Sequence, residues 1–208
     1  MIHTIFFDLD NTIYPRDSGL WEAISERINL YMMDILHIRK NDIPAIRQYC
    51  RQNHGTTLQG LQSLYQIDEA DFLFFVHDID LSKILSDDGK LLKLLTSIPQ
   101  KKMIFTNSDA AHVNRVLDFF SVRSYFDLII DVLSLKPYVK PHHEAFEKAL
   151  SISGLTSPDG CIFIDDMIEN VKQGQKMGFL SILVGEPNEN IINIPDIFML
   201  PNILESLN

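Results

Sequence analysis

The chain has 208 residues, 46% of them hydrophobic and 22% charged, and its 18 basic against 28 acidic side chains give a formal net charge of −10. This composition is ordinary for a globular enzyme with a sizeable core. The acidic balance argues against a nucleic-acid polymer or an anionic membrane as partner, and no apolar stretch predicts a spanning helix. We expect a cytoplasmic protein with two reduced cysteines, Cys50 and Cys161, and the oligomeric state stays open.

The first predicted element is a buried strand that ends on two carboxylates. Residues 5–7 are apolar and are followed by Asp8 and Asp10. Side chains two positions apart in an extended segment share a face, so these two carboxylates can converge where the chain turns. Like charges that close repel unless a cation lies between them, and Mg²⁺ is the candidate because it prefers oxygen ligands. An acidic turn is the alternative interpretation.

Residues 16–80 are predicted to be a helical insert. Apolar residues recur at helical spacing, Pro44 follows a capping position, and no strand pattern interrupts the segment. A parallel crossover needs only about a dozen residues, so an insert of this length is a separate small domain. Four aromatic residues are expected in the core of this domain rather than on a base-stacking surface: Trp21, Phe72, Phe74 and Phe75.

Strand and helix patterns alternate from residue 81 to the end. Strands are predicted at 101–105, 126–132, 161–164, 181–184 and 197–200, and helices at 85–98, 109–119, 141–153 and 167–177. The alternation predicts an α/β fold: a Rossmann-like three-layer core with a parallel sheet, made of residues 1–15 and 81–208, plus the inserted α-helical domain.

Three further polar clusters follow predicted strands, and the carboxyl ends of parallel strands meet at one edge of the sheet. The clusters are Thr106-Asn107-Ser108, Lys140-Pro141 and Asp165-Asp166. The first could hold phosphoryl oxygens at a helix N-terminus or simply cap the helix. Lys140 is preferred to Lys136, which also precedes a proline, because Pro141 opens a predicted helix.

In this order the chain contains F-F-D-L-D-N-T, T-N-S, K-P and I-D-D, with Asn170 after the last. Over nearly its whole length it therefore resembles the haloacid dehalogenase superfamily of phosphatases. The extended start F-F-D-L-D-N-T-I-Y-P is most similar to the branch that contains pyrimidine 5′-nucleotidases. The resemblance implies that the helical insert is the cap domain of this superfamily.

Both the residue chemistry and the resemblance assign Asp8 as a nucleophile that forms an aspartyl-phosphate. Asp10 would protonate the leaving oxygen and then activate water. Lys140 would neutralise the phosphate and the nucleophile, and Thr106 and Asn107 would hold phosphoryl oxygens.

The expected cofactor is Mg²⁺. Its ligands would be Asp8, the backbone carbonyl of Asp10 and the Asp165-Asp166 pair. The resemblance implies that Asp166 binds directly and Asp165 through water. Where many relatives have a carboxylate, this chain has an amide at Asn170. Three residues are assigned only tentatively to the surroundings of the site: Asn170, Asn11 and Ser108.

The expected function is a Mg²⁺-dependent phosphomonoester hydrolase acting on a small phosphorylated metabolite, with a pyrimidine 5′-nucleotide first. The alternatives are a phosphoglycolate or sugar-phosphate phosphatase, a phosphomutase, and a non-catalytic phospho-accepting module. The last alternative explains neither the helical insert nor an acid at Asp10. Three single histidines, His3, His77 and His112, are expected to be structural or on the surface, and His142-His143 to be a solvated helix start.

Overall fold

The computed structural model describes residues 1–207 and divides into two compact units. One unit comprises residues 1–18 and the chain from 86 onward, and the other comprises residues 19–85. The boundaries expected from the sequence, after residues 15 and 80, lie a few residues away. Asn208, the last residue of the expected core domain, lies outside the described residues.

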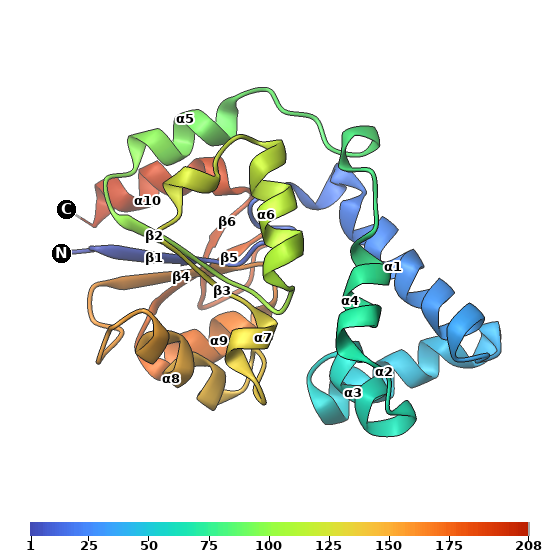
Figure 1. The fold of residues 1–208 in the computed structure, drawn as a ribbon. Coiled ribbons are helices and arrows are strands. Elements are labelled where there is room, and N and C mark those ends of the chain that lie inside the picture. The colour runs from blue at the N-terminus through green and yellow to red at the C-terminus, as the bar shows by residue number, and fades with distance from the viewer. Residues whose placement is uncertain (208) are drawn as a thin grey trace. The chain divides into compact units, whose positions relative to one another are not determined.

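The larger unit is built on a parallel sheet, as the alternating pattern predicted. Its six strands occur in the order β3-β2-β1-β4-β5-β6 within the described residues, and each neighbouring pair is parallel (Figure 1). The bounds are β1 Thr4–Phe7, β2 Lys101–Phe105, β3 Leu128–Ile130, β4 Cys161–Asp165, β5 Leu180–Val184 and β6 Ile192–Ile194. Because β1 lies in the interior of the sheet, the residues that follow it have strands on both sides.

Helices cover both faces of this sheet. The helices α5, α6 and α10 lie on one face, and α7, α8 and α9 lie on the other (Figure 1). Their bounds are α5 Lys90–Ser97, α6 Ala110–Phe119, α7 Val132–Leu135, α8 His143–Ile152, α9 Ile168–Met177 and α10 Leu200–Ser206. The predicted three-layer Rossmann-like core is thus confirmed.

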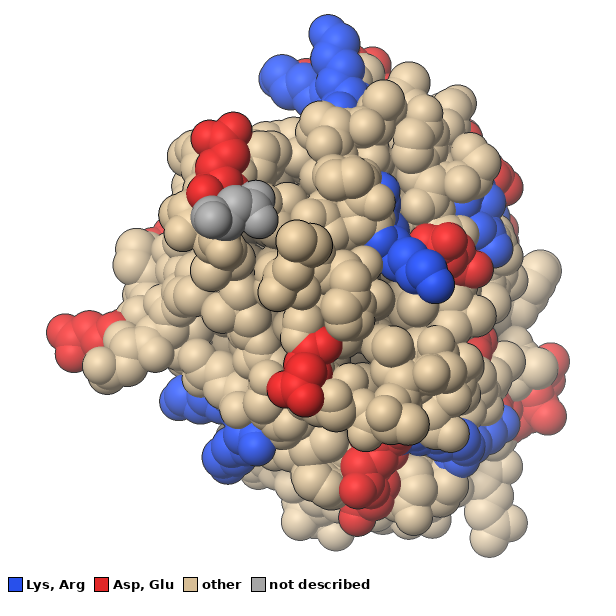
Figure 2. All heavy atoms as spheres, turned by 90° about the vertical axis from the view of Figure 1, so that its left-hand side faces the viewer, with Lys and Arg blue, Asp and Glu red and all other residues tan. Residues whose placement is uncertain are grey.

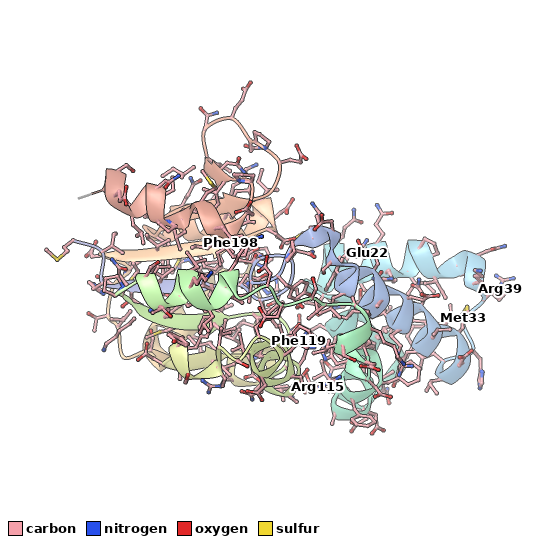
Figure 3. The ribbon with its side chains drawn as sticks, turned by 90° about the horizontal axis from the view of Figure 1, so that it is seen from above. Glu22, Met33, Arg39, Arg115, Phe119 and Phe198 are labelled. Carbon is pink, nitrogen blue, oxygen red and sulfur yellow. The ribbon has the colours of Figure 1, made fainter. Side chains whose placement is uncertain are left out.

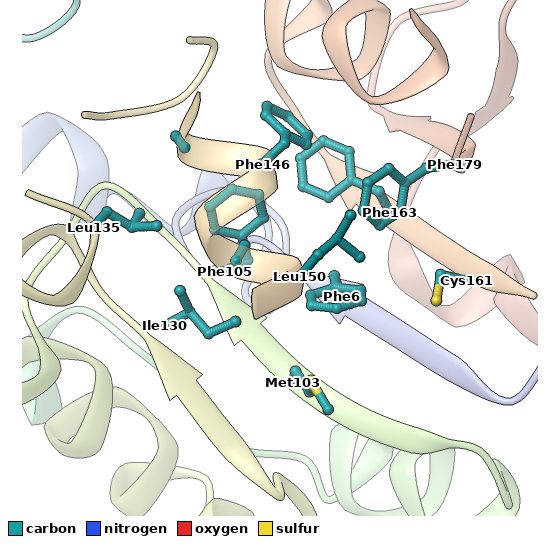
Figure 4. Packing of buried hydrophobic residues seen from close by; sticks show 12 residues of the cluster. Phe6, Met103, Phe105, Ile130, Leu135, Phe146, Leu150, Cys161, Phe163 and Phe179 are labelled. Carbon is teal, nitrogen blue, oxygen red and sulfur yellow. The ribbon is translucent and has the colours of Figure 1, made fainter. Parts of the chain in front are cut away.

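Aromatic side chains fill the layer beneath α8. Phe6, Phe105 and Phe163 come from β1, β2 and β4 and pack with Phe146 of α8 and with Phe179 (Figure 4). The ring centroid of Phe146 lies 5.1 Å from those of Phe105 and Phe163, in edge-to-face geometry. Edge-to-face pairs add stability beyond area burial, so this cluster fixes the strands whose carboxyl ends carry the polar residues.

The strand predicted at 197–200 is wrong. This segment is a 3₁₀-helix at Ile197–Met199 that leads into α10, and the edge strand is β6 instead. Asp196 starts the helical turn, since its carboxylate accepts from the Phe198 N–H at 2.9 Å. The buried positions 197, 200 and 204 recur at helical spacing. The four residues 197–200 are too few to distinguish the helical period of about 3.6 residues from the strand period of about two.

Two other predicted elements are shorter in the structure, because aspartates bind nearby backbone N–H groups. The helix expected at 85–98 begins at Lys90, after Asp87 and Asp88 accept from the N–H groups of Gly89 and Lys90. The strand expected at 126–132 ends at residue 130, where Asp131 caps α7.

The smaller unit contains helices and no strand between residues 19 and 85. Its main elements are α1 Leu20–Leu30, a π-helical turn Tyr31–Ile35, α2 Ile43–His54, α3 Thr57–Tyr65 and α4 Glu69–His77. Phe72 is buried as expected, but Phe74 is 77% exposed and Trp21 is 38% exposed, so the expectation that both lie in the core is wrong. Apolar residues occur around much of α4, so the sequence did not show which side faces solvent.

A surface groove of about 660 Å³ lies beside α1 in this unit. Trp21, Glu22, Met33 and Ile43 are among the residues that line it. Figure 3 shows Glu22 near the start of α1 and Met33 in the π-helical turn that follows. The exposed part of Trp21 therefore belongs to a concave surface.

Charged side chains are dispersed over the face of the molecule drawn in Figure 2. On that face, blue and red groups stand apart among uncharged atoms, without a continuous basic patch among the described residues. Within residues 1–207, every helix is too short or too polar to cross a bilayer.

Gly60 of α3 packs directly against Cys50 of α2, so we predict that Gly60→Ala destabilises the protein. An added Cβ would lie 2.3 Å from Cβ and Sγ of Cys50. Overpacking of this kind costs about 1–3 kcal/mol of unfolding free energy. Urea denaturation measures the loss, with Ser63→Ala at an exposed position of the same helix as control. A Gly60→Ala midpoint equal to that of Ser63→Ala would contradict the prediction.

Candidate active site

The polar residues predicted at strand ends gather at the carboxyl edge of the sheet. Asp8 directly follows β1, and its N–H donates to the Ile164 carbonyl of β4 at 2.8 Å. Thr106 directly follows β2, and its N–H donates to the Ile130 carbonyl of β3 at 3.0 Å. Asp165 is the last residue of β4. Strand pairing thus continues into the site and fixes its backbone.

Lys140 lies at the centre of the site and is 1% exposed. Its Nζ donates to Asp8 Oδ1 at 2.7 Å, to Asp165 Oδ2 at 2.6 Å and to the Phe105 carbonyl at 2.7 Å. Burial alone would lower the pKa of Lys140, but the charges of Asp165 and Asp8 raise it, so the ammonium group stays charged. The structure places Lys140, and not the exposed Lys136, against the predicted nucleophile.

Asn107 fixes the backbone of the segment that carries Lys140. Its Nδ2 donates to the Lys140 carbonyl at 2.9 Å, and its Oδ1 accepts from the Lys140 N–H at 2.9 Å. Thr106 is 1% exposed, and its Oγ1 accepts from the Ser108 N–H at 3.0 Å. In this structure both predicted phosphate-binding side chains therefore shape the loops, and their contact with a phosphate stays a prediction.

Three carboxylates converge beside Lys140. Asp8, Asp165 and Asp166 each offer one oxygen within 4.8 Å of the others. Asp165 is engaged by the protein, since it accepts from Lys140 and from the Met167 N–H at 2.8 Å. Asn170 Nδ2 also donates to both of its oxygens, to Oδ1 at 2.9 Å and to Oδ2 at 3.0 Å. An amide at position 170 suffices for this contact because its role is that of a donor.

Asn11 holds the other carboxylate of the pair. Its backbone has φ 59°, a left-handed conformation that asparagine tolerates, and its Nδ2 donates to Asp166 Oδ2 at 3.1 Å. Within residues 1–207, Asn11 Oδ1 is buried and lacks a hydrogen-bond partner. A buried acceptor beside clustered carboxylates suits a cation with bound water.

The carboxylates of the acidic cluster repel one another although Lys140 is bound to two of them. Burial, together with the charge of Asp165, raises the pKa of Asp166 to about 6. Burial also raises the pKa of Asp8 well above its usual range, although Lys140 opposes the shift. Oxygen ligands, excess negative charge and the orphaned Asn11 Oδ1 together fit Mg²⁺.

Asp10 is held by a separate set of side chains. Its Oδ1 accepts from the Tyr14 hydroxyl at 2.6 Å and from His112 Nε2 at 3.1 Å, and its Oδ2 accepts from Ser108 Oγ at 2.6 Å. Burial alone would raise the pKa of Asp10, but His112 and the hydroxyl hydrogen bonds outweigh burial and lower it. Without a bound substrate, these donors therefore favour the carboxylate form of Asp10.

Two of these partners were not identified as site residues from the sequence. His112 was expected to be structural or on the surface, yet it is 1% exposed and contacts Asp10. Tyr14 belongs to the extended start of the chain, but no site role was predicted for it. The available signals were the position of His112 in the first turn of α6, just after Thr-Asn-Ser, and the four-residue spacing from Asp10 to Tyr14. Of the expected solvated pair, His143 is 57% exposed and contacts Glu147.

We predict that stabilisation by Mg²⁺ increases with pH. The folded-state pKa of Asp166, about 6, exceeds the ordinary value of 3.8, so the metal-free folded protein binds more protons between these values. Its stability therefore falls as pH rises through that interval, while Mg²⁺ requires the deprotonated form. Melting temperatures with and without Mg²⁺ at about pH 5 and pH 7.5 measure the effect. Asp166→Asn should remove most of this pH dependence. An equal shift of the melting temperature by Mg²⁺ at both pH values would contradict the prediction.

Comparisons with known proteins identify the family of this chain. A family model of haloacid dehalogenase-like hydrolases matches residues 2–178. "Phosphate metabolism protein 8" of Saccharomyces cerevisiae is 28% identical over 187 residues, which are 83% of this chain and 58% of that protein. The chain thus spans less than two thirds of that relative's length.

Solved structures share the fold. The HAD-hydrolase YfnB of Bacillus subtilis, bound to magnesium, superposes with a TM-score of 0.66 at 19% identity, over 98% of this chain and 99% of that one. The L-2-haloacid dehalogenase of Xanthobacter autotrophicus superposes with a TM-score of 0.65 at 15% identity, over 100% of both chains. At these identities the likeness concerns the fold alone.

Proposed function

The chain belongs to the haloacid dehalogenase-like hydrolases, and from that premise we propose that it is a Mg²⁺-dependent phosphomonoester hydrolase. The observation that carries the proposal is the second carboxylate, Asp10, buried beyond the nucleophile and held by three hydrogen-bond donors. Displacement of a halide needs no acid for its leaving group, whereas an alkoxide leaving from a phosphate ester does. The word "phosphate" in the yeast relative's name accords with this choice.

In the first half-reaction, the Asp8 carboxylate attacks phosphorus and the ester P–O bond breaks. Asp10 binds a proton from solvent when the phosphate ester enters and gives this proton to the leaving oxygen, so the products are an alcohol and an aspartyl-phosphate. Lys140 favours this step because its ammonium group, 2.7 Å from Asp8, offsets negative charge as the phosphate approaches.

In the second half-reaction, water attacks phosphorus and the bond between phosphorus and Asp8 oxygen breaks. Asp10, now a carboxylate, takes one proton from the water and is thereby returned to its protonated form. Inorganic phosphate leaves, and Asp8 is a carboxylate again. When bound by Asp8, Asp166 and the Asp10 backbone carbonyl, Mg²⁺ would neutralise charge on the phosphoryl oxygens.

The proposed substrate is a small phosphorylated metabolite, and a pyrimidine 5′-nucleotide is the first to test because of the chain's extended start. The helical unit, residues 19–85, is proposed to be the cap domain and to select the substrate. The proposed identity of the substrate rests on the sequence resemblance. In this proposal the core residues at the sheet edge bind the phosphate group, which all such substrates share.

Free-phosphate release from a panel of esters tests the proposal, with Mg²⁺ and with a chelator in place of Mg²⁺. The panel contains UMP, CMP, AMP, phosphoglycolate and several sugar phosphates, and halide release from 2-chloropropionate is measured in parallel. Mg²⁺-dependent release with a preference for UMP or CMP is the expected result. Halide release without phosphate release would overturn the proposal, and an isomeric ester in place of phosphate would identify a mutase.

A further inference from the structure

The carboxyl group of Asp10 is enclosed by donors from three different parts of the fold. Tyr14 follows β1, Ser108 follows β2, and His112 lies in α6. The three are 0%, 8% and 1% exposed. We propose that Tyr14, Ser108 and His112 are positioning residues that hold the Asp10 carboxyl group in one orientation through both half-reactions. This inference rests on the proposed phosphatase function.

The hydrogen bonds leave Asp10 little freedom to rotate. An ionised carboxylate has about four acceptor positions, and here Oδ1 has two donors while Oδ2 has one. Rotation of the group would break bonds of 2.6 Å from both hydroxyls at once. The remaining acceptor position lies on Oδ2, which leaves that oxygen able to meet a leaving group or a water.

Asp8 and Asp10 have separate hydrogen-bond partners. The ammonium group of Lys140 binds Asp8 and Asp165, and the donors on Asp10 are two hydroxyls and an imidazole. An ammonium group is a donor only, so it suits a carboxylate that remains an anion until it attacks. Two neighbouring acidic residues are thereby given different environments, which is how paired carboxylates take different roles.

The residue types on Asp10 suit a group that alternates between carboxylate and carboxylic acid. A hydroxyl is both a donor and an acceptor, so Tyr14 and Ser108 can donate to the carboxylate and accept from the acid without moving. Against a carboxylate, His112 Nε2 acts as a donor. The carboxyl group can therefore keep its place when it gives and regains its proton.

A purely structural role for the three residues would give a different kinetic result. If they only join α6 to β1, their removal lowers stability and leaves turnover per folded molecule unchanged. If they position Asp10, kcat falls and KM changes little, since the substrate phosphate is bound by other groups. Their effects should also vanish once Asp10 itself is replaced, because residues that act through one group are not additive.

The test compares Tyr14→Phe, Ser108→Ala and His112→Gln with wild type in steady-state hydrolysis of the preferred ester. Each of the first two is expected to lower kcat by about 10–100-fold with KM within about twofold, because a misplaced acid or base loses this order of rate. His112→Gln keeps an N–H donor and should lose less than His112→Ala. In an Asp10→Asn background, Tyr14→Phe should change kcat by less than about twofold. Tyr31→Phe and Ser181→Ala, which remove buried hydroxyls elsewhere, are the controls.

Melting temperature and circular dichroism show which variants fold. If Tyr14→Phe does not fold, Ser108→Ala and His112→Gln test the positioning role. Unchanged kcat in the folded variants, or an undiminished effect of Tyr14→Phe in the Asp10→Asn background, would overturn the inference. Wild-type turnover in the same assay separates this failure from failure of the proposed function. A wild type that releases no phosphate from any ester would remove the function, whereas an active wild type with equally active variants removes only the positioning role.

Discussion

Asp8→Asn is expected to reduce phosphate release by a factor on the order of 10⁴ or more, to background. The amide has nearly the shape of the carboxylate but cannot attack phosphorus. The protein should remain folded, because Lys140 keeps its bonds to Asp165 and to the Phe105 carbonyl. The substitution also removes one negative charge from the buried cluster that contains Asp165 and Asp166. Phosphate release and melting temperature, measured together, test both expectations.

Trapping of the intermediate gives the decisive form of this experiment. Wild type that turns over a radiolabelled ester and is quenched in acid should carry label on the peptide that contains Asp8, and Asp8→Asn should carry none. Asp17→Asn, at an exposed position on the same segment, is the matched control and should behave as wild type. Retention of about a tenth of wild-type activity by Asp8→Asn would show that another group is the nucleophile.

The convergence of Asp8, Asp165 and Lys140 could be predicted because it follows from topology. Asp8 and Asp165 lie at or just after the carboxyl end of a parallel strand, and Lys140 lies shortly before helix α8, which crosses back to the sheet. Apolar runs identify such strands, and parallel pairing brings their ends to one edge. The parallel sheet and its two helical layers were predictable for the same reason, since alternating patterns of this length have few other solutions.

The partners of Asp10 could not be predicted in this way. Tyr14 reaches Asp10 because the chain turns back after β1, where the Ile13 N–H donates to the Leu9 carbonyl at 2.9 Å. His112 reaches it only because α6 starts beside that turn. Such approaches depend on loop geometry, which hydrophobic spacing does not encode. Exposure of Phe74 and the helical turn at 197–199 were missed for a related reason, because short or uniformly apolar segments give no clear period.

Lys140→Ala is expected to lower both activity and stability more than any other single change to a lysine in the site region. Removal of one partner from a buried ion pair typically costs about 3–5 kcal/mol, because the remaining charge is left uncompensated. Here Asp8 and Asp165 would lose the ammonium group that both bind, so their negative charges would repel each other and that of Asp166. Phosphate release should fall at least about 100-fold, since the charge that offsets the approaching phosphate is gone.

The pH dependence of this variant distinguishes lost charge from lost packing. Without the ammonium group, which opposes the upward shift, the pKa of Asp8 should rise further in the folded state, so protonation stabilises the variant below that folded pKa. The destabilisation relative to wild type is therefore expected to be largest near neutral pH and to shrink on acidification. Urea unfolding at several pH values measures it. Lys136→Ala, at the exposed Lys-Pro of similar sequence, is the control and should keep wild-type stability and turnover. A stability loss that is independent of pH would show that Lys140 contributes by packing alone, and a larger loss of turnover in Lys136→Ala would transfer the phosphate-binding role to that residue.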